Sequence, residues 1–126
     1  MNMKYSKNVI LELYSEGDMD DVFVEQLVGF VRFDERDCAK NLTNEQVFRR
    51  TIELVRFFTK DGDFFLLKGG RTPEGVFFFS PVNEDPGNVF HHMSLPDDLH
   101  NSFVLRKAVI GKAPGAIPEN ILKIVA

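Results

Sequence analysis

Acidic side chains crowd one stretch of the chain and are the first candidates for chemistry. Residues 16–37 hold eight acidic and nine large apolar residues. Asp18, Asp20 and Asp21 could coordinate a divalent cation, and the KDGD segment offers a second acidic group. A calcium loop, however, needs oxygen ligands at alternate positions and a glutamate at the twelfth, and neither stretch has this pattern. We therefore predict no metal site, and we expect Asp18 to cap a helix instead.

Histidine and cysteine offer a second set of reactive groups. His91 and His92 are adjacent, His100 is nearby, and Cys38 is the single cysteine of the sequence. Adjacent side chains on a strand point to opposite faces, so the two histidines are not expected to share a metal ion. Nothing around Cys38 marks an activated thiol. We predict no catalytic residue and no cofactor. One alternative is a small-ligand binder or enzyme with His91, His92 or Asp63 at the mouth of a phenylalanine-rich pocket.

Basic residues form two weaker patterns. The segment KGGRTPEG is glycine-rich, but it lacks the G-x-x-x-x-G-K-[ST] pattern of a phosphate loop and lies between two expected strands. We therefore predict a hairpin loop there. Arg49, Arg50 and Arg56 share an expected helix ahead of this hairpin, an order found in winged-helix DNA readers. Acidic residues lie on the same helix and on the helix before it, so phosphate repulsion argues against DNA binding.

Helical periodicity predicts the elements that position these groups. Apolar residues at helical spacing predict a helix over residues 5–16 that Gly17 ends. A second helix is expected to begin at Asp18 as its N-cap. Gly29 lies inside this second helix, where glycine costs about 1 kcal/mol against alanine. We therefore expect a close packing contact at Gly29.

A third helix and a hairpin are expected to follow. Thr43 and Gln46 form the T-x-x-Q pattern of a capping box, and the helix after them is expected to end at Gly62. The segments DFFLLK and GVFFFS (residues 63–68 and 75–80) then predict two strands of a hairpin. Both are nearly continuous in hydrophobicity, so we expect both of their faces to be covered.

The last third of the chain is expected to mix a strand with helices. The segment VFHHMS, residues 89–94, predicts a third strand, and Ser94 is expected to start a helix that ends at Gly111. A loop and a short helical segment after Pro118 complete the chain. The expected fold is a single α+β domain over residues 1–126. Its helices pack on a small, mostly antiparallel sheet, with helical segments at the C-terminal end.

Charge is distributed unevenly along the 126 residues. Residues 1–45 carry ten acidic and five basic residues, a net charge of −5, and residues 46–126 carry nine acidic and ten basic residues, a net charge of +1. Such a chain is not expected to bind nucleic acid directly and is better matched to a basic protein. The N-terminal stretch does not resemble a secretory signal, and no apolar window has transmembrane length. We therefore expect a cytoplasmic protein without a membrane partner.

These features resemble, as a type, the small cytosolic bacterial immunity proteins that neutralise contact-dependent or polymorphic toxins. The resemblance rests on a single acidic domain of this size without a catalytic motif. It also rests on residues 16–37 as a toxin-facing surface and on TNEQVFRRTIELVRFFTKDGDFFLLKGG as a helix-to-strand scaffold. It implies one-to-one binding of a basic toxin, expected to be a nuclease, whose active site the acidic surface would occlude. The expected partner-binding residues are Asp18, Asp20, Asp21 and Glu25, followed by Asp34, Glu35 and Asp37. A homodimeric adaptor subunit, paired through an exposed strand, is the other alternative.

Overall fold

The computed structural model describes residues 5–34, 41–60, 63–93, 99–100, 102–108 and 119–125. The helices and strands follow one another along the chain in the order α1 (Lys7–Met19), β1 (Val22–Phe23), α2 (Val24–Asp34), α3 (Asn44–Lys60), β2 (Phe64–Arg71), β3 (Phe77–Pro81), α4 (Pro86–Val89), β4 (Phe103–Lys107) and α5 (Glu119–Leu122).

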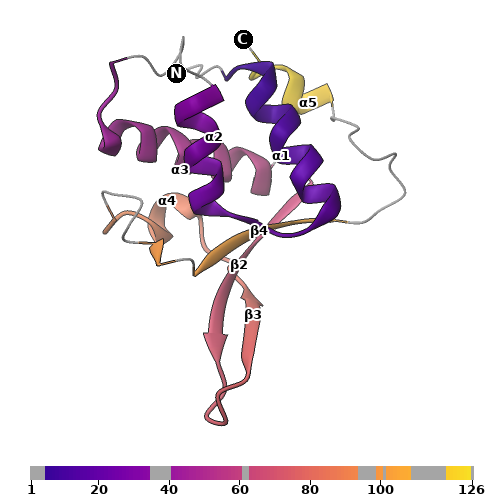
Figure 1. Cartoon of the computed structure of the whole chain (residues 1–126), viewed down its shortest axis with the longest axis vertical. Helices are drawn as coiled ribbons and strands as arrows, with labels where there is room; N and C mark the ends of the chain where they lie inside the picture. The colour runs from indigo at the N-terminus through magenta and orange to yellow at the C-terminus, as the bar shows by residue number, and fades with distance from the viewer. Residues whose placement is uncertain are drawn as a thin grey trace.

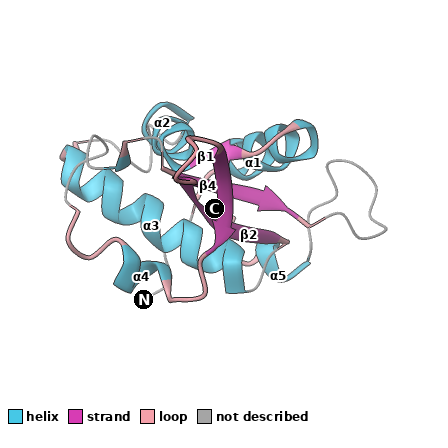
Figure 2. Cartoon of the chain, turned by 90° about the horizontal axis from the view of Figure 1, so that it is seen from below, coloured by secondary structure: helices cyan, strands magenta, loops and turns pink. Residues whose placement is uncertain are grey.

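The strands form one antiparallel sheet in the order β1-β4-β2-β3. β4 therefore lies between β1 and β2, although it comes last in the sequence, and β3 lies at an edge. The helices gather at one end of the molecule, and the β2–β3 hairpin projects from the other end (Figure 1). In the view from below, α1 and α2 lie above the strands and α3 lies to their left (Figure 2). The predicted α+β class and the mostly antiparallel sheet are confirmed.

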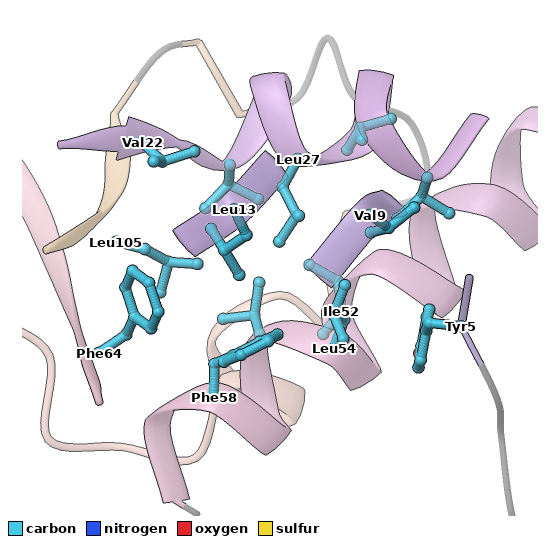
Figure 3. Close-up of a cluster of buried hydrophobic side chains, with 14 of the residues drawn as sticks. Tyr5, Val9, Leu13, Val22, Leu27, Ile52, Leu54, Phe58, Phe64 and Leu105 are labelled. Atoms are coloured by element: carbon cyan, nitrogen blue, oxygen red, sulfur yellow. The ribbon is translucent and has the colours of Figure 1, made fainter. Parts of the chain in front are cut away.

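One hydrophobic core joins the helices to one face of the sheet (Figure 3). α3 supplies one side of it, with Val47, Phe48, Thr51, Ile52, Leu54, Val55 and Phe58 buried. Phe64 of β2 and Leu105 of β4 close the core from the sheet. The capping box predicted for α3 is confirmed, because Gln46 N–H donates to Thr43 Oγ1 at 3.1 Å and Thr43 N–H donates to Gln46 Oε1 at 2.7 Å.

The boundary between the first two helices differs from the prediction. α1 continues through Gly17 to Met19, so Asp18 lies within this helix and is not the N-cap of the next one. The chain then passes through β1 before α2 begins at Val24. The physical reason is packing: Gly17 lies against Phe64, and a Cβ placed on Gly17 would come within 2.8 Å of the Phe64 ring. Gly17 thus serves close helix–strand contact and does not end the helix.

The prediction of a close packing contact at Gly29 is wrong. A Cβ placed on Gly29 would meet no atom of the described residues within 4 Å, apart from its chain neighbours and the backbone of its own helix. We expect Gly29→Ala to raise the free energy of unfolding by about 0.5–1 kcal/mol, because alanine is the better helix former. We expect Gly17→Ala to lower it, because a buried overlap costs about 1–3 kcal/mol and the Phe64 ring is itself buried. Urea unfolding of the two variants would test this, and shifts of the same sign would contradict it.

The hairpin prediction is confirmed, because β2 and β3 pair antiparallel from Leu67↔Pro81 to Arg71↔Phe77. The expectation that both of its faces are covered is wrong. Phe65, Phe77 and Phe78 are exposed. Most of the hairpin projects beyond the helices (Figure 1), so continuous hydrophobicity here does not reflect burial.

Two elements of the last third were predicted wrongly. The strand expected over residues 89–94 is replaced by α4 and a turn, because Asp85 caps the helix and Pro86 begins it. The helix expected from Ser94 to Gly111 is replaced over Phe103–Lys107 by β4, which pairs with both β1 and β2. Residues 94–98 and 109–118 lie outside the described residues. The short terminal helix after Pro118 is confirmed as α5.

Candidate functional site

Two of the predicted partner-binding carboxylates form ion pairs within the protein. Asp21 accepts two hydrogen bonds from the Arg106 guanidinium, 2.9 Å from Nε and 2.8 Å from Nη2. Asp18 forms an ion pair with the Lys107 ammonium group. The Asp21 carboxylate, by its hydrogen bonds and its charge, holds the pKa of Arg106 above its ordinary value. Asp18 and Asp21 therefore join the end of α1 and the start of β1 to β4, and much of their charge is neutralised.

Asp20 lies between these two ion pairs and has a different role. It is the C-cap residue of α1 and is exposed, and its Oδ1 accepts a hydrogen bond from Asp21 N–H at 2.7 Å. Glu16 and Glu12 lie one and two helical turns before it. Residues four apart share one side of a helix, so Glu12, Glu16 and Asp20 form a stripe, which we call the acidic stripe. No ion pair to these three side chains occurs among the described residues.

The end of α1 concentrates negative potential. The last turn of α1 contains no basic residue, and Glu16 lies within it. A helix C-terminus carries a partial negative charge, so an acidic residue there destabilises the helix by about 0.3–1 kcal/mol. The acidic stripe thus adds to the helix dipole instead of opposing it. A cationic group on a partner would be attracted to this point.

Apolar side chains lie beside the acidic stripe. Leu11 is 41% exposed and Met19 is 78% exposed, and each directly precedes a residue of the stripe in the sequence. A shallow groove of about 410 Å³ lies along the same helix, lined by Asn8, Leu11, Glu12 and Ser15. The outer surface of α1 therefore combines carboxylates with exposed apolar groups.

Of the remaining predicted acidic residues, only the side chain of Glu25 lies within the described part of the structure. Glu25 is half-buried in the first turn of α2, where its negative charge interacts favourably with the positive end of the helix dipole. Asp34 is the last residue of α2, and its side chain lies outside the described part of the structure. Glu35 and Asp37 lie outside the described residues altogether, as does Cys38.

The histidines occupy a second hollow on the surface. His91 and His92 follow α4 in a turn, not on a strand, and their ring centroids are 3.5 Å apart. They line a groove of about 690 Å³ together with residues of β2, β3 and β4, among them Lys68 and Phe103. His91 Nδ1 lies 2.6 Å from the Asn88 carbonyl oxygen. Because a carbonyl oxygen only accepts, Nδ1 carries the proton in this contact.

Other candidate groups lie away from the histidine groove. Asp63, which was expected at the mouth of a pocket, accepts a hydrogen bond from the Tyr14 hydroxyl at 3.4 Å. It is not among the residues that line the groove. Burial, with the nearby Asp63 charge, raises the pKa of Tyr14 well above its ordinary value. Among the described residues, no three histidine, cysteine or acidic side chains are grouped so that they could hold a metal ion.

Comparisons with known proteins were made for the whole chain. They match no protein-family model, no curated protein and no solved structure. In the described segments, no helix is both long enough and apolar enough to cross a membrane. The site must therefore be interpreted from the chemistry of its own residues.

The arginines of α3 are engaged in contacts within the protein. Arg49 donates hydrogen bonds to the carbonyl oxygens of Phe90, at 3.2 Å, and of Met93. The Arg50 guanidinium lies 4.4 Å from the centroid of the Tyr5 ring. These contacts tie α3 to α4 and to the start of the chain. Neither side chain is directed away from the protein as a DNA-reading residue would be.

Arg56 and Lys60 meet at one carboxylate. Asp85 Oδ2 lies 3.1 Å from Arg56 Nε and 3.0 Å from Lys60 Nζ, and its Oδ1 accepts from Gly87 N–H at 2.8 Å. The Lys60 hydrogen bond, followed by that of Gly87 N–H, holds the pKa of Asp85 below its ordinary value. Asp85 therefore joins α3 to the start of α4.

This lowered pKa predicts a specific dependence of stability on pH. A carboxyl group with a lowered pKa in the folded state stabilises the protein above its ordinary pKa, and this contribution is lost as the pH falls through and below that value. We expect Asp85→Asn to be less stable than the wild type at pH 7, with the difference shrinking towards pH 3. Urea unfolding across this range would measure it. The neighbouring exposed residue Glu84, changed to glutamine, is the control, and a difference that does not vary with pH would contradict the prediction.

Proposed function

We propose that this protein acts by binding a basic protein partner through the outer surface of α1. The observation that carries the proposal is the acidic stripe of Glu12, Glu16 and Asp20, which runs along α1 to the negative end of its dipole. Acidic residues at that end oppose the stability of the helix, whereas the comparable carboxylates Asp18 and Asp21 are paired with cations. An arrangement that costs stability and leaves charge exposed is typical of a binding surface.

The partner we propose is a toxin with a cationic active-site cleft, such as a nuclease. Enzymes that bind nucleic acid concentrate positive charge in the cleft, and a row of carboxylates on a helix can occupy the place of substrate phosphates. The mechanism is electrostatic attraction followed by steric occlusion, without any chemistry by this protein. Exposed Leu11 and Met19 would supply apolar contacts beside the charges.

This proposal changes the surface expected from the sequence. Asp20 stays in it as the end of the acidic stripe, and Glu12 and Glu16 enter it. Asp18 and Asp21 support this surface indirectly, because their ion pairs with Lys107 and Arg106 hold the end of α1 against β4. Asp34, Glu35 and Asp37 are not part of this proposal, because their side chains lie outside the described part of the structure.

The test is affinity capture with two matched baits. One bait is the wild-type protein, and the other carries Glu12→Lys, Glu16→Lys and Asp20→Lys. Each is exposed to lysate of the source cell in which the product of the gene immediately upstream is co-expressed. We expect the wild-type bait to retain a stoichiometric basic protein that is toxic when expressed alone, and the reversed bait to lose it. No partner, or equal retention by both baits, would overturn the proposal.

A second candidate function is the binding of a small ligand in the groove beside His91 and His92. The observation that favours it is the groove itself, of about 690 Å³, with two imidazoles and the ammonium of Lys68 at its wall. A ligand in this groove should raise the thermal unfolding midpoint of the wild type and not of a His91→Ala/His92→Ala variant. The same double substitution should leave capture of a protein partner by α1 unchanged.

A further inference from the structure

The outer strand of the projecting hairpin is exposed and uncharged. β3 consists of Phe77, Phe78, Phe79, Ser80 and Pro81, and it pairs only with β2 among the described strands. Phe77 is 48% exposed and Phe78 is 43% exposed. Exposed edge strands are usually protected by charged side chains, by proline or by a bulge. Only Pro81, at the end of β3, provides such protection.

Within the described part of the chain, the backbone of β3 has hydrogen-bonding groups without a partner on its outer side. At the turn, Thr72 N–H donates to Val76 C=O at 2.9 Å. In an antiparallel pair, residues that bond to the neighbouring strand alternate with residues that do not. Phe78, two residues after Val76, therefore directs its peptide groups towards β2. Phe77 and Phe79 direct their N–H and C=O groups away from β2, towards the free edge.

The aromatic side chains leave this edge accessible. The Phe77 ring lies over Gly69 of β2, where a Cβ would come within 2.9 Å of its Cζ atom. The Phe78 ring lies over Gly70, where the corresponding distance is 3.2 Å. Both rings thus fold back over glycines of the neighbouring strand. The glycines make room for them, and the rings do not cover the outer side of β3.

We propose that β3 is the contact of a symmetric homodimer, in which the β3 strands of two copies pair antiparallel about Phe78. In this register Phe77 of each copy faces Phe79 of the other, so the outward N–H groups of each strand meet outward carbonyl groups. Pro81 has no N–H to donate, and it falls opposite Gly75 in the turn, where no donor is required. A shift of the centre to Ser80 would instead place Pro81 opposite Phe79 and lose a hydrogen bond.

A second copy fits this edge better than a charged partner does. β3 has no ionisable side chain, so two copies meet without like charges facing each other. The hairpin extends away from the helices (Figure 1), so two hairpins can align side by side without collision of the helical ends. The opposite edge of the sheet is the two-residue strand β1. With one long edge and one short edge, pairing through β3 closes a dimer and does not continue into a filament.

The dimer is independent of the proposed function. α1 lies with the other helices, at the opposite end of the molecule from the hairpin (Figure 1). Dimerisation through β3 would therefore leave the acidic stripe of each copy accessible. Failure of one proposal leaves the other standing, since the stripe and β3 can be changed separately.

Molar mass measured against concentration is the first test. Sedimentation equilibrium of the wild type is expected to show a dimer. Phe79→Lys is expected to raise the dimer dissociation constant by roughly tenfold or more, because it places like charges near each other in the pair. The control is Phe65→Lys, since Phe65 is 57% exposed on β2 and away from the edge. A monomeric wild type at every concentration would overturn the proposal, as would equal weakening by both variants.

Disulfide cross-linking tests the register without relying on a disruptive substitution. In a Cys38→Ser background, Phe78→Cys places one thiol of each copy on the two-fold axis. Directly opposite residues that are not hydrogen-bonded lie about 4.5 Å apart between Cα atoms, which a disulfide can bridge. We expect rapid oxidation of Phe78→Cys to a covalent dimer and much slower oxidation of Phe77→Cys. Equal rates for the two variants would overturn the register and the proposal.

Discussion

Replacing Phe58 with alanine is expected to lower the free energy of unfolding by about 3–5 kcal/mol. Phe58 is fully buried on α3. Its ring makes edge-to-face contacts with Tyr14 of α1, at a centroid distance of 5.7 Å, and with Phe64 of β2, at 5.4 Å. Tyr14 and Phe64 are also in contact, at 5.3 Å. Removal of Phe58 leaves a cavity where two helices and the sheet meet (Figure 3).

The matched control for this prediction is Phe65→Ala. Phe65 is the next residue to Phe64 on β2, but its side chain points to the other face of the sheet and is exposed. We expect its removal to change stability by about 0.5 kcal/mol or less. Guanidinium unfolding of both variants would measure the contrast. The expected loss is a large fraction of the total free energy of unfolding of a small domain, which is about 5–15 kcal/mol. A loss below about 1 kcal/mol for Phe58→Ala would contradict the packing described here.

α3 could be predicted from the sequence because its signals are local. The capping box of Thr43 and Gln46 lies within four residues, and the apolar positions recur at helical spacing along the same segment. Such local patterns predict a secondary structure without information about the rest of the fold. The hairpin was predictable for the same reason, because its turn residues lie between its strands.

Elements decided by distant contacts could not be predicted. Gly17 resembles a helix end by its type, yet its position is set by Phe64, which lies 47 residues further along the chain. Phe103–Lys107 has apolar residues that also fit a helical spacing. Pairing with β1 on one side and β2 on the other makes it a central strand. No pattern within the segment itself indicates that it pairs with β1 and β2.

The concentration of acidic residues could be predicted from the sequence, but the surface that they form could not. The sequence shows that acidic residues concentrate around residues 16–37, and it does not show which of them have cationic partners. Arg106 and Lys107, which pair with Asp21 and Asp18, lie more than 80 residues away. Glu12 was detectable in principle, because it stands four residues before Glu16 and eight before Asp20. A helix that ends at Gly17 would not include Asp20, so the predicted helix end hides this spacing.

Reversal of the acidic stripe is expected to have the largest effect on partner binding. Changing Glu12, Glu16 and Asp20 to lysine should weaken binding by roughly tenfold or more, equivalent to about 1.4 kcal/mol. Most of this loss should appear as a slower association rate, because exposed charges act mainly by steering the encounter. The association rate of the variant should also depend less on salt concentration, because salt screens the attraction between exposed charges that the variant has lost. Surface plasmon resonance at low and physiological ionic strength, with the captured partner, would measure both.

The control must carry the same change in charge at another place. Glu45, Glu74 and Glu84 are exposed and lie at the start of α3, in the hairpin turn and before α4. Changing these three residues to lysine alters the net charge of the protein as much as reversal of the stripe does. If net charge alone attracts the partner, the two triple variants will bind equally weakly. If the stripe is the contact, the control will lose much less affinity.

The stability of the stripe variant separates a lost contact from a damaged fold. Glu16 and Asp20 lie at the negative end of α1, so lysine there interacts favourably with the helix dipole, by about 0.3–1 kcal/mol for each residue. We therefore expect the variant to bind more weakly and yet to unfold at the same or a higher urea concentration. Selection for stability alone would not favour a carboxylate at Glu16, in the last turn of the helix. Weaker binding accompanied by lower stability would instead assign the acidic stripe to the fold, and the proposed contact would have to be abandoned.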